Sequence, residues 1–144
     1  VRFERDHIMT HAYIALLIYC LWMISMLFMM LVVRVKAVRK GLRSKDITPF
    51  NENISPFANR LSRAHANCYE NLPIFAAIVL VVAMNNALDI LQGTALVFIV
   101  ARILQSMAHF YSGRMRVVMI RGAFFGVQVF LQIYWIIMLL IKIM

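Results

Sequence analysis

The densest group of polar residues lies between residues 59 and 73, at the start of a long apolar stretch. Within it, Arg60, Arg63, Asn67 and Glu70 follow one another at intervals of three or four residues, so on an α-helix they fall within an arc of about 80°. Arginines bind carboxylates through two parallel hydrogen bonds, and a glutamate can hold an ammonium group. The stripe therefore favours either a site for a small zwitterionic ligand or a hydrogen-bonded network that only holds helices together.

A second polar stripe occurs further along the chain, where Arg102, Gln105 and His109 share one face of a helix and Tyr111 falls on the opposite face. An arginine in such apolar surroundings needs a polar partner. Glu70 is the natural partner on a neighbouring helix. We therefore expect Arg102 and Glu70 to form a structural ion pair, with a ligand role for Arg102 as the alternative.

A third group begins at Arg121, which shares a helix face with Gln128 and Gln132. The two glutamines are most simply explained as hydrogen-bonding links between helices. We expect Arg121 to lie at a helix N-terminus, where the helix dipole and the guanidinium together favour an anion. The alternative for Arg121, Arg114 and Arg116 is that their charge only sets the orientation of the chain in a membrane.

The composition explains why these polar residues stand out. Hydrophobic residues make up 63% of the 144 residues and charged residues only 15%, whereas soluble domains are roughly 45–50% apolar. A chain of this size has too little interior to hide that much apolar surface, which argues against a soluble globular enzyme or a disordered chain. The two cysteines give no disulfide framework. The net charge of +9 indicates membrane topology and an anionic ligand before it indicates nucleic acid, so we expect no nucleic-acid partner.

Four stretches are long and apolar enough to cross a bilayer, which takes about 20 residues. We predict an all-α integral membrane protein, a bundle of four transmembrane helices forming a single domain over residues 1–144, with spans at about 11–35, 60–86, 89–112 and 118–142. Basic residues gather in the first and third connections, which the positive-inside rule places in the cytoplasm. Both termini then lie on the opposite side of the membrane.

The polar stretch of the second span resembles a signature of the MAPEG superfamily, the membrane-associated proteins of eicosanoid and glutathione metabolism. The matching residues are Arg60-x-x-Arg63-Ala64-His65-x-Asn67-x-x-Glu70-Asn71-x-Pro73. Shorter motifs in the other spans agree with it, namely Val33-Arg34-Val35-Lys36, Ala101-Arg102-Ile103 followed by Ala108-His109, and Arg121-Gly122-Ala123-Phe124-Phe125. The last of these is most similar to the start of the fourth helix in microsomal glutathione transferases.

The resemblance implies a homotrimer of four-helix subunits that binds glutathione between subunits at the cytoplasmic side. Glutathione would be a co-substrate and would attack a lipophilic electrophile, or reduce a hydroperoxide, that arrives from the bilayer; membrane lipids are the other partners. No metal is implied, and no group of His, Cys, Asp and Glu has metal-ligand spacing. The alternatives are a dedicated eicosanoid synthase of the same superfamily and a non-catalytic membrane module that binds lipids or partner proteins.

Carried over residue by residue, the resemblance implies a set of glutathione contacts. These are Arg34, Arg63, His65, Asn67 and Glu70, joined from the third span by Gln105 and His109. Arg121 matches the arginine that activates the thiol in the family, and Arg116 is its rival because the spacing before Arg121 is longer than in some relatives.

The sequence departs from the family pattern at three positions. Asn59 stands where a glutamate is frequent, and Ala66 where prostaglandin synthase has an arginine. His109 stands where a tyrosine is usual, and either His109 or the nearby Tyr111 could take the role of that tyrosine.

Overall fold

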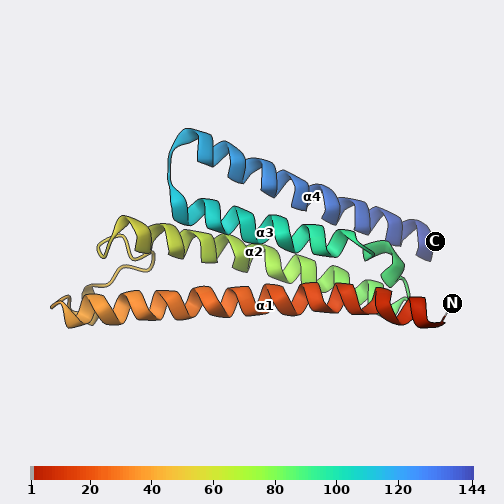
Figure 1. The fold of residues 1–144 in the computed structure, drawn as a ribbon, viewed down its shortest axis with the longest axis horizontal. Coiled ribbons are helices and arrows are strands. Elements are labelled where there is room, and N and C mark those ends of the chain that lie inside the picture. The colour runs from red at the N-terminus through yellow and green to blue at the C-terminus, as the bar shows by residue number, and fades with distance from the viewer. Residues whose placement is uncertain (1) are drawn as a thin grey trace.

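Four long helices make up the chain. This computed structural model describes residues 2–144, with side chains described from residue 11 onward. The helices are α1 (Arg2–Arg39), α2 (Pro56–Met84), α3 (Thr94–Tyr111) and α4 (Met115–Ile143), and short 3₁₀ turns at Ser44–Asp46 and Leu88–Leu91 interrupt two of the connections. The helices run alternately up and down, with α1 and α4 on the outside of the row and α2 and α3 between them (Figure 1).

The predicted fold class is confirmed. Each of the four helices is long and apolar enough to span a membrane, and the residues from 2 to 144 contain no strand. In Figure 1 the N- and C-termini lie at one end of the bundle, and the α1–α2 and α3–α4 connections lie at the other. This arrangement follows from four consecutive antiparallel spans joined by connections that cannot themselves cross the bilayer.

The helix boundaries differ from the expected ones for local reasons. Helix α2 begins at Pro56, ahead of the expected residue 60, because the Ser55 side chain accepts a hydrogen bond from the backbone N–H of Ala58 at 3.1 Å and a proline suits the first helical position. Helix α3 begins at Thr94 and not at 89, because Gly93 has a φ of +71°, which is outside the helical range and available to glycine without strain.

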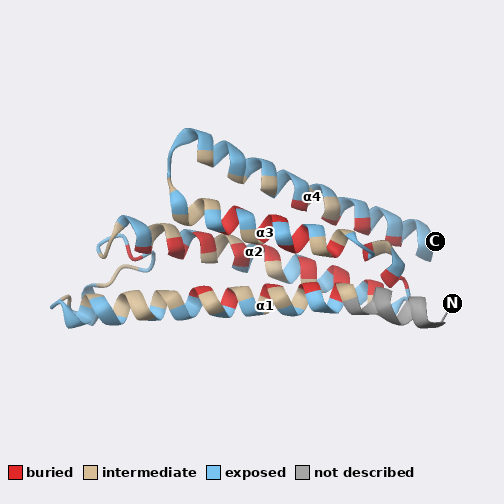
Figure 2. Ribbon diagram, in the orientation of Figure 1, coloured by how far each residue is buried: buried red, intermediate tan, exposed pale blue. Residues whose placement is uncertain are grey.

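The core lies where α1, α2 and α3 meet. Phe75 and Phe98 stack there with ring centroids 4.4 Å apart, and Tyr19 and Trp135 pack against the same pair. Figure 2 shows the buried residues on the facing sides of these helices, whereas most of α4 is exposed. In a bilayer the apolar outer faces need no covering, so the specificity of the fold comes from close packing and from polar contacts between helices.

Polar contacts of this kind fix α4 on the rest of the bundle. The Gln128 side-chain amide donates to Gln105 Oε1 at 3.0 Å, and the Gln132 amide donates to Asn71 Oδ1 at 2.6 Å. Both glutamines are buried. The interpretation of the two glutamines as links between helices is therefore confirmed.

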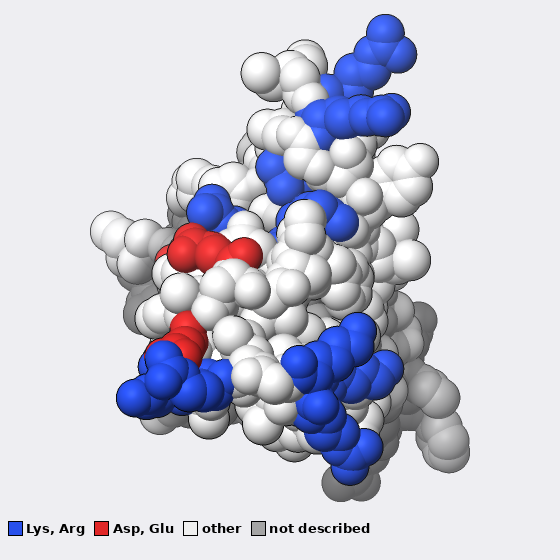
Figure 3. Space-filling model, turned by 90° about the vertical axis from the view of Figure 1, so that its left-hand side faces the viewer, with Lys and Arg blue, Asp and Glu red and all other residues white. Residues whose placement is uncertain are grey.

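We call the end that carries the α1–α2 and α3–α4 connections the basic end, comprising residues 34–63 and 109–121. Figure 3 looks onto this end and shows several separate clusters of Lys and Arg side chains among uncharged residues, with two smaller patches of Asp and Glu. The fold therefore brings the basic ends of all four helices to one side of the molecule.

Candidate functional site

Arg121 and His109 contact each other where α4 packs against α3. The distance from Arg121 Nη1 to His109 Nδ1 is 2.9 Å, and both residues are half-buried. Arg121 shares the buried face of α4 with Gln128, seven residues later, so its side chain is directed at α3. Because a guanidinium can only donate hydrogen bonds, Nδ1 is the acceptor and the proton of His109 is on Nε2.

The position of Arg121 within its helix is a correction to the sequence-based expectation. Helix α4 begins at Met115, so Arg121 lies in its second turn and not at its N-terminus. The helix dipole acts mainly within the first turn. The attraction of this position for an anion therefore comes from the Arg121 guanidinium and not from the dipole of α4.

Arg102 is completely buried, with 0% of its surface exposed. Its Nη1 donates to Asn67 Oδ1 at 2.5 Å, and its Cζ lies 5.8 Å from the centre of the Tyr19 ring, within range of a cation–π contact. The Nε and Nη2 atoms of Arg102 have no hydrogen-bond partner among the described residues. A charge so deep in the bundle is held only by an amide oxygen and an aromatic face.

The expected ion pair of Arg102 with Glu70 does not form within the described chain, and this expectation is corrected. Glu70 is exposed, and none of the ion pairs of residues 11–144 includes Arg102. The reason is the helical register. The buried face of α2 is centred near Cys68 and Asn71, and at about 100° per residue Glu70 points well away from it. Asn67 lies at the edge of the buried face, and its side-chain oxygen is the partner of Arg102 that was expected to be Glu70.

Arg60 is held by the end of α3. Its Nε donates to the backbone carbonyl of Phe110 at 3.1 Å, and the residue is half-buried. The last carbonyl groups of a helix have no partner within the helix, so they are ready acceptors for such a donor. This contact joins the start of α2 to the end of α3 at the basic end.

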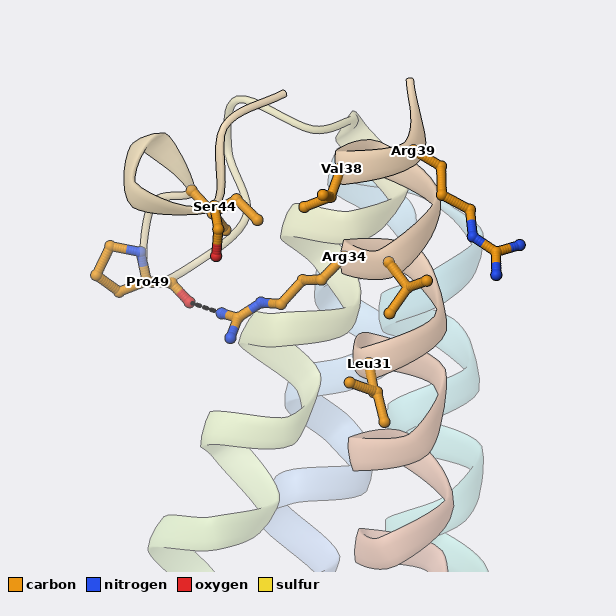
Figure 4. Close-up of a pocket in the computed structure, with 8 residues that line it drawn as sticks. Leu31, Arg34, Val38, Arg39, Ser44 and Pro49 are labelled. Carbon is orange, nitrogen blue, oxygen red and sulfur yellow. Dashed lines mark hydrogen bonds between the residues drawn. The ribbon is translucent and has the colours of Figure 1, made fainter. Parts of the chain in front are cut away.

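Arg34 lies at the end of α1, where it reaches toward the α1–α2 connection. Its Nε donates to Asn51 Oδ1 at 2.7 Å, and its Nη2 donates to the Pro49 carbonyl at 3.2 Å. Figure 4 shows Arg34 directed from α1 toward Pro49, with the Ser44 side chain nearby. These residues border a cavity of about 560 Å³, whose remaining walls are mainly apolar. This volume is typical of small-molecule sites.

Asn51 organises the loop around Arg34. It is fully buried, and its Nδ2 donates to Ser62 Oγ at 2.6 Å while its Oδ1 accepts from Arg34. Its φ of +54° is a left-handed conformation that asparagine tolerates better than most residues. Neither Asn51 nor Ser62 was predicted from the sequence as a residue of this site. The signal in the sequence was an asparagine in an irregular, proline-containing loop that follows the span carrying Arg34.

The remaining predicted site residues differ in exposure. The side chain of Arg63 is 63% exposed and lies 4.0 Å from Glu52, a surface pair that adds little stability. His65 is half-buried, and its Nε2 has no hydrogen-bond partner among the described residues. Tyr111 is 81% exposed and Arg116 is also exposed. Of the two candidates for the tyrosine position, the structure therefore brings His109 to Arg121 and leaves Tyr111 on the surface.

The four arginines described above share one electrostatic property. Arg34, Arg60, Arg102 and Arg121 are each held by uncharged acceptors: an amide, a carbonyl or a neutral imidazole. None of them takes part in an ion pair with a described acidic residue. Neutral acceptors orient a guanidinium without cancelling its charge, which is the arrangement expected of a site that stabilises an anion.

Two of these arginines, Arg34 and Arg121, lie in different parts of the single chain, and each marks a separate group of candidate site residues. Arg34 and its cavity lie between α1 and the α1–α2 connection, whereas Arg121 lies between α3 and α4. Helix α1 packs mainly on α2 and α3, and α4 packs mainly on α3, so the two groups are on different sides of the bundle (Figure 1).

Comparison with known proteins gives one match. The model of the MAPEG family matches residues 12–141, which is nearly the whole chain. No curated protein and no solved structure matches it.

Proposed function

Since the chain belongs to the MAPEG family, we propose that this membrane protein activates glutathione as its thiolate and uses it against lipophilic molecules. The reaction is either transfer of glutathione to an electrophilic carbon or reduction of a lipid hydroperoxide. The observation that supports this proposal best is that Arg34, Arg60 and Arg121 at the basic end are each oriented by an uncharged acceptor and keep their positive charge. Glutathione carries two carboxylates and, in its reactive form, a thiolate, so it matches that charge.

Arg121 is the residue proposed to stabilise the thiolate. A free thiol has a pKa of about 8.5, and only the thiolate attacks efficiently. A guanidinium beside the sulfur favours the ionised form. A shift of two units corresponds to about 2.7 kcal/mol and raises the thiolate fraction at neutral pH from a few per cent to about three quarters.

The chemistry needs no further group from the protein. In the transfer reaction, an electron pair of the sulfur forms the new C–S bond while the leaving group departs with its own bonding pair. In the reduction, the sulfur attacks the terminal oxygen of the hydroperoxide, an S–O bond forms as the O–O bond breaks, and the alkoxide takes up a proton from water. The thiol of a second glutathione then attacks the resulting sulfenic acid, which forms the disulfide and releases water. The bilayer supplies the apolar substrate at high local concentration.

The proposal includes a homotrimer with the site shared between copies, and a basic end that faces the cytoplasm. Arg34 with its cavity and Arg121 with His109 lie on different sides of one chain. A second copy that places its α3–α4 side against the α1 side of the first would unite the two groups around one glutathione. The concentration of basic residues in the first and third connections supports the cytoplasmic orientation.

The test is the ultraviolet absorbance of the thiolate on addition of glutathione to the detergent-solubilised protein, with glutathione affinity measured by calorimetry. We expect a thiolate signal in the wild type that is lost in Arg121→Ala and kept in Arg114→Ala, an exposed arginine that directly precedes α4. An equal signal in Arg121→Ala would reject Arg121 as the activator, and the same experiment on Arg116→Ala would then identify its rival.

Two other outcomes would change the proposed function itself. Absence of glutathione binding would favour a non-catalytic membrane module. Activity toward a single eicosanoid, with none toward a generic aromatic halide or a panel of hydroperoxides, would favour a dedicated synthase.

A further inference from the structure

We propose that the basic end binds an anionic phospholipid of the surrounding bilayer, in a cavity separate from the one beside Arg34. This cavity has a volume of about 340 Å³ and lies between the end of α1 and the residues that lead into α2. Two lysines, Lys36 and Lys40, line it together with four apolar residues, an asparagine and a serine, and no acidic residue is in the lining. A mixed cationic and apolar lining suits a ligand that has an anionic part and an apolar part.

The walls of the cavity are held in place by hydrogen bonds. At the end of α1, Gly41 has a φ of +99°, and the N–H of Leu42 donates to the Ala37 carbonyl at 3.2 Å, so that the chain folds back over the last turn of the helix. On the opposite wall, Asn53 Nδ2 donates to the Asp46 carbonyl at 2.6 Å. The α1–α2 connection is therefore tied together around the cavity before any ligand binds.

The two lysines are not neutralised by acidic residues of the chain. Both acidic residues of the α1–α2 connection are close to arginines instead, since Asp46 pairs with Arg43 at 2.7 Å and Glu52 lies 4.0 Å from Arg63. Neither lysine takes part in an ion pair within residues 11–144. Because they lie one turn apart on α1, they present two neighbouring positive charges to the cavity.

The start of α2 adds to this attraction for an anion. Ser55, the N-cap residue of α2, is part of the cavity lining. The first N–H groups of a helix carry a partial positive charge and are frequent binding sites for phosphate. The cavity therefore combines two lysines with the positive end of a helix that runs for 29 residues.

The depth of the lysines matches the headgroup layer of a bilayer. The uncharged run of α1 from Ala12 to Val33 is about 33 Å long at 1.5 Å per residue, close to the thickness of about 30 Å of a hydrocarbon core. Lys36 then lies at the edge of the hydrocarbon, and Lys40 lies about 6 Å further out, where lipid phosphates are found.

The side of α1 that carries the lysines is apolar toward the middle of the bilayer. Met29, Val33, Lys36 and Lys40 fall within an arc of about 60° on the helix. Apolar groups are thus followed by cations from the bilayer centre to its surface, which is the order of acyl chain and phosphate in a phospholipid. A zwitterionic lipid fits less well, because the lysines repel its own cation.

The experiment compares two pairs of substitutions in the detergent-solubilised full chain. Lys36→Gln with Lys40→Gln removes the two charges of the cavity. Lys45→Gln with Arg114→Gln is the control, because it removes two charges from exposed residues of the basic end that do not line the cavity. Binding of phosphatidylglycerol from mixed micelles is measured by calorimetry and native mass spectrometry, with phosphatidylcholine as the zwitterionic comparison.

We expect the affinity for phosphatidylglycerol to fall at least about tenfold in the first pair, because each lysine near a membrane surface contributes about fivefold, and no more than about twofold in the control pair. An equal loss in both pairs would show that only the net charge attracts the lipid. Equal binding of phosphatidylcholine by the wild type would show that no net negative charge is required. Either result would overturn the proposal.

Ala37→Leu tests the cavity without a change of charge. Ala37 is half-buried in the lining, and both residues favour a helix, so the larger side chain fills part of the cavity while α1 is kept. We expect weaker binding of phosphatidylglycerol, and undiminished binding would overturn the proposal.

Glycerol phosphate, a soluble headgroup without acyl chains, separates the lipid from a free phosphate. At millimolar concentration it should not displace phosphatidylglycerol, and displacement would assign the cavity to a soluble phosphate compound instead. The proposal does not depend on the proposed function, so a chain that binds phosphatidylglycerol but no glutathione would retain this site and lose only the transferase.

Discussion

Single residues at the basic end show how a membrane protein can keep charged groups oriented without neutralising them. Arg34 is the most elaborate case, because its acceptor, Asn51, is itself held in a left-handed conformation and bonded to Ser62. Removing one partner from such a buried group costs more than the hydrogen bond alone, since the other partner stays desolvated. Asn51 should therefore matter both to stability and to the orientation of Arg34.

Substitution of Asn51 by glycine isolates the role of its side chain. Glycine adopts positive φ without strain, so only the hydrogen bonds to Arg34 and Ser62 are lost. We expect a destabilisation of about 1–3 kcal/mol in detergent unfolding, and about a tenfold weaker affinity for glutathione by calorimetry if Arg34 binds it.

Asn86 provides the matched control for this substitution. It also has a positive φ, of 53°, but it is exposed and lies in the α2–α3 connection, far from the basic end. Asn86→Gly should change stability by no more than about 0.5 kcal/mol. Equal effects of the two glycine substitutions would show that Asn51 serves only to shape the turn.

At the scale of the helices, hydropathy carries most of the information about the fold. This is because each helix satisfies its own backbone hydrogen bonds and is therefore stable in the membrane independently of the others. The four spans could therefore be predicted, with errors of a few residues where a cap or a glycine sets the boundary, as at Ser55 and Gly93. The two buried glutamines of α4 could also be predicted, since a helix in lipid has few other reasons to carry them.

The partners of individual polar residues were harder to predict than the helices. Spacing showed correctly that Arg102 needs a partner, but it selected Glu70 by charge, whereas the helical register presents Asn67. Asn51 was missed because its importance comes from a loop conformation that has no periodicity to detect. Opposite charges in a sequence suggest an ion pair, but the direction in which each side chain leaves its helix decides which acceptor an arginine can reach.

The pairing of Gln132 with Asn71 is the element-scale contact that is simplest to measure. The amide of Gln132 donates to Asn71 at 2.6 Å and joins α4 to α2. A double-mutant cycle with Gln132→Leu and Asn71→Leu should give a coupling free energy of about 0.6 kcal/mol, and no more than about 1.7 kcal/mol, because the unfolded chain in a membrane also finds polar partners.

The cycle is measured by detergent unfolding of the four proteins, and it contains its own control. Each single variant leaves one buried amide without its partner, so the double variant should be less destabilised than the two single variants added together. Strict additivity would mean that the two amides do not depend on each other, and that the attachment of α4 comes from packing alone.

At the scale of the whole molecule, Arg34 and Arg121 lie on different sides of the bundle, although the proposed function requires both to bind one glutathione. Glutathione cannot contact Arg34 and Arg121 of one chain at once if α2 and α3 stand between them, as the packing of the helices indicates. In the proposed trimer, each copy would place its α1 side against one neighbour and its α3–α4 side against the other. Under the proposed function, the two arginines would therefore meet only in the assembly.

Mixing two inactive variants tests this condition directly. Arg34→Ala and Arg121→Ala should each be impaired as pure proteins, but co-expressed in equal amounts they should regain thiolate formation at roughly a quarter of the sites if each site takes its two arginines from different copies. If each site lies within one chain, every site lacks one arginine and nothing is regained. The wild type co-expressed with the double variant sets the scale, because it should leave roughly a quarter of shared sites intact but about half of sites that lie within one chain. Recovery in the first mixture together with a quarter in the second would place the site between copies.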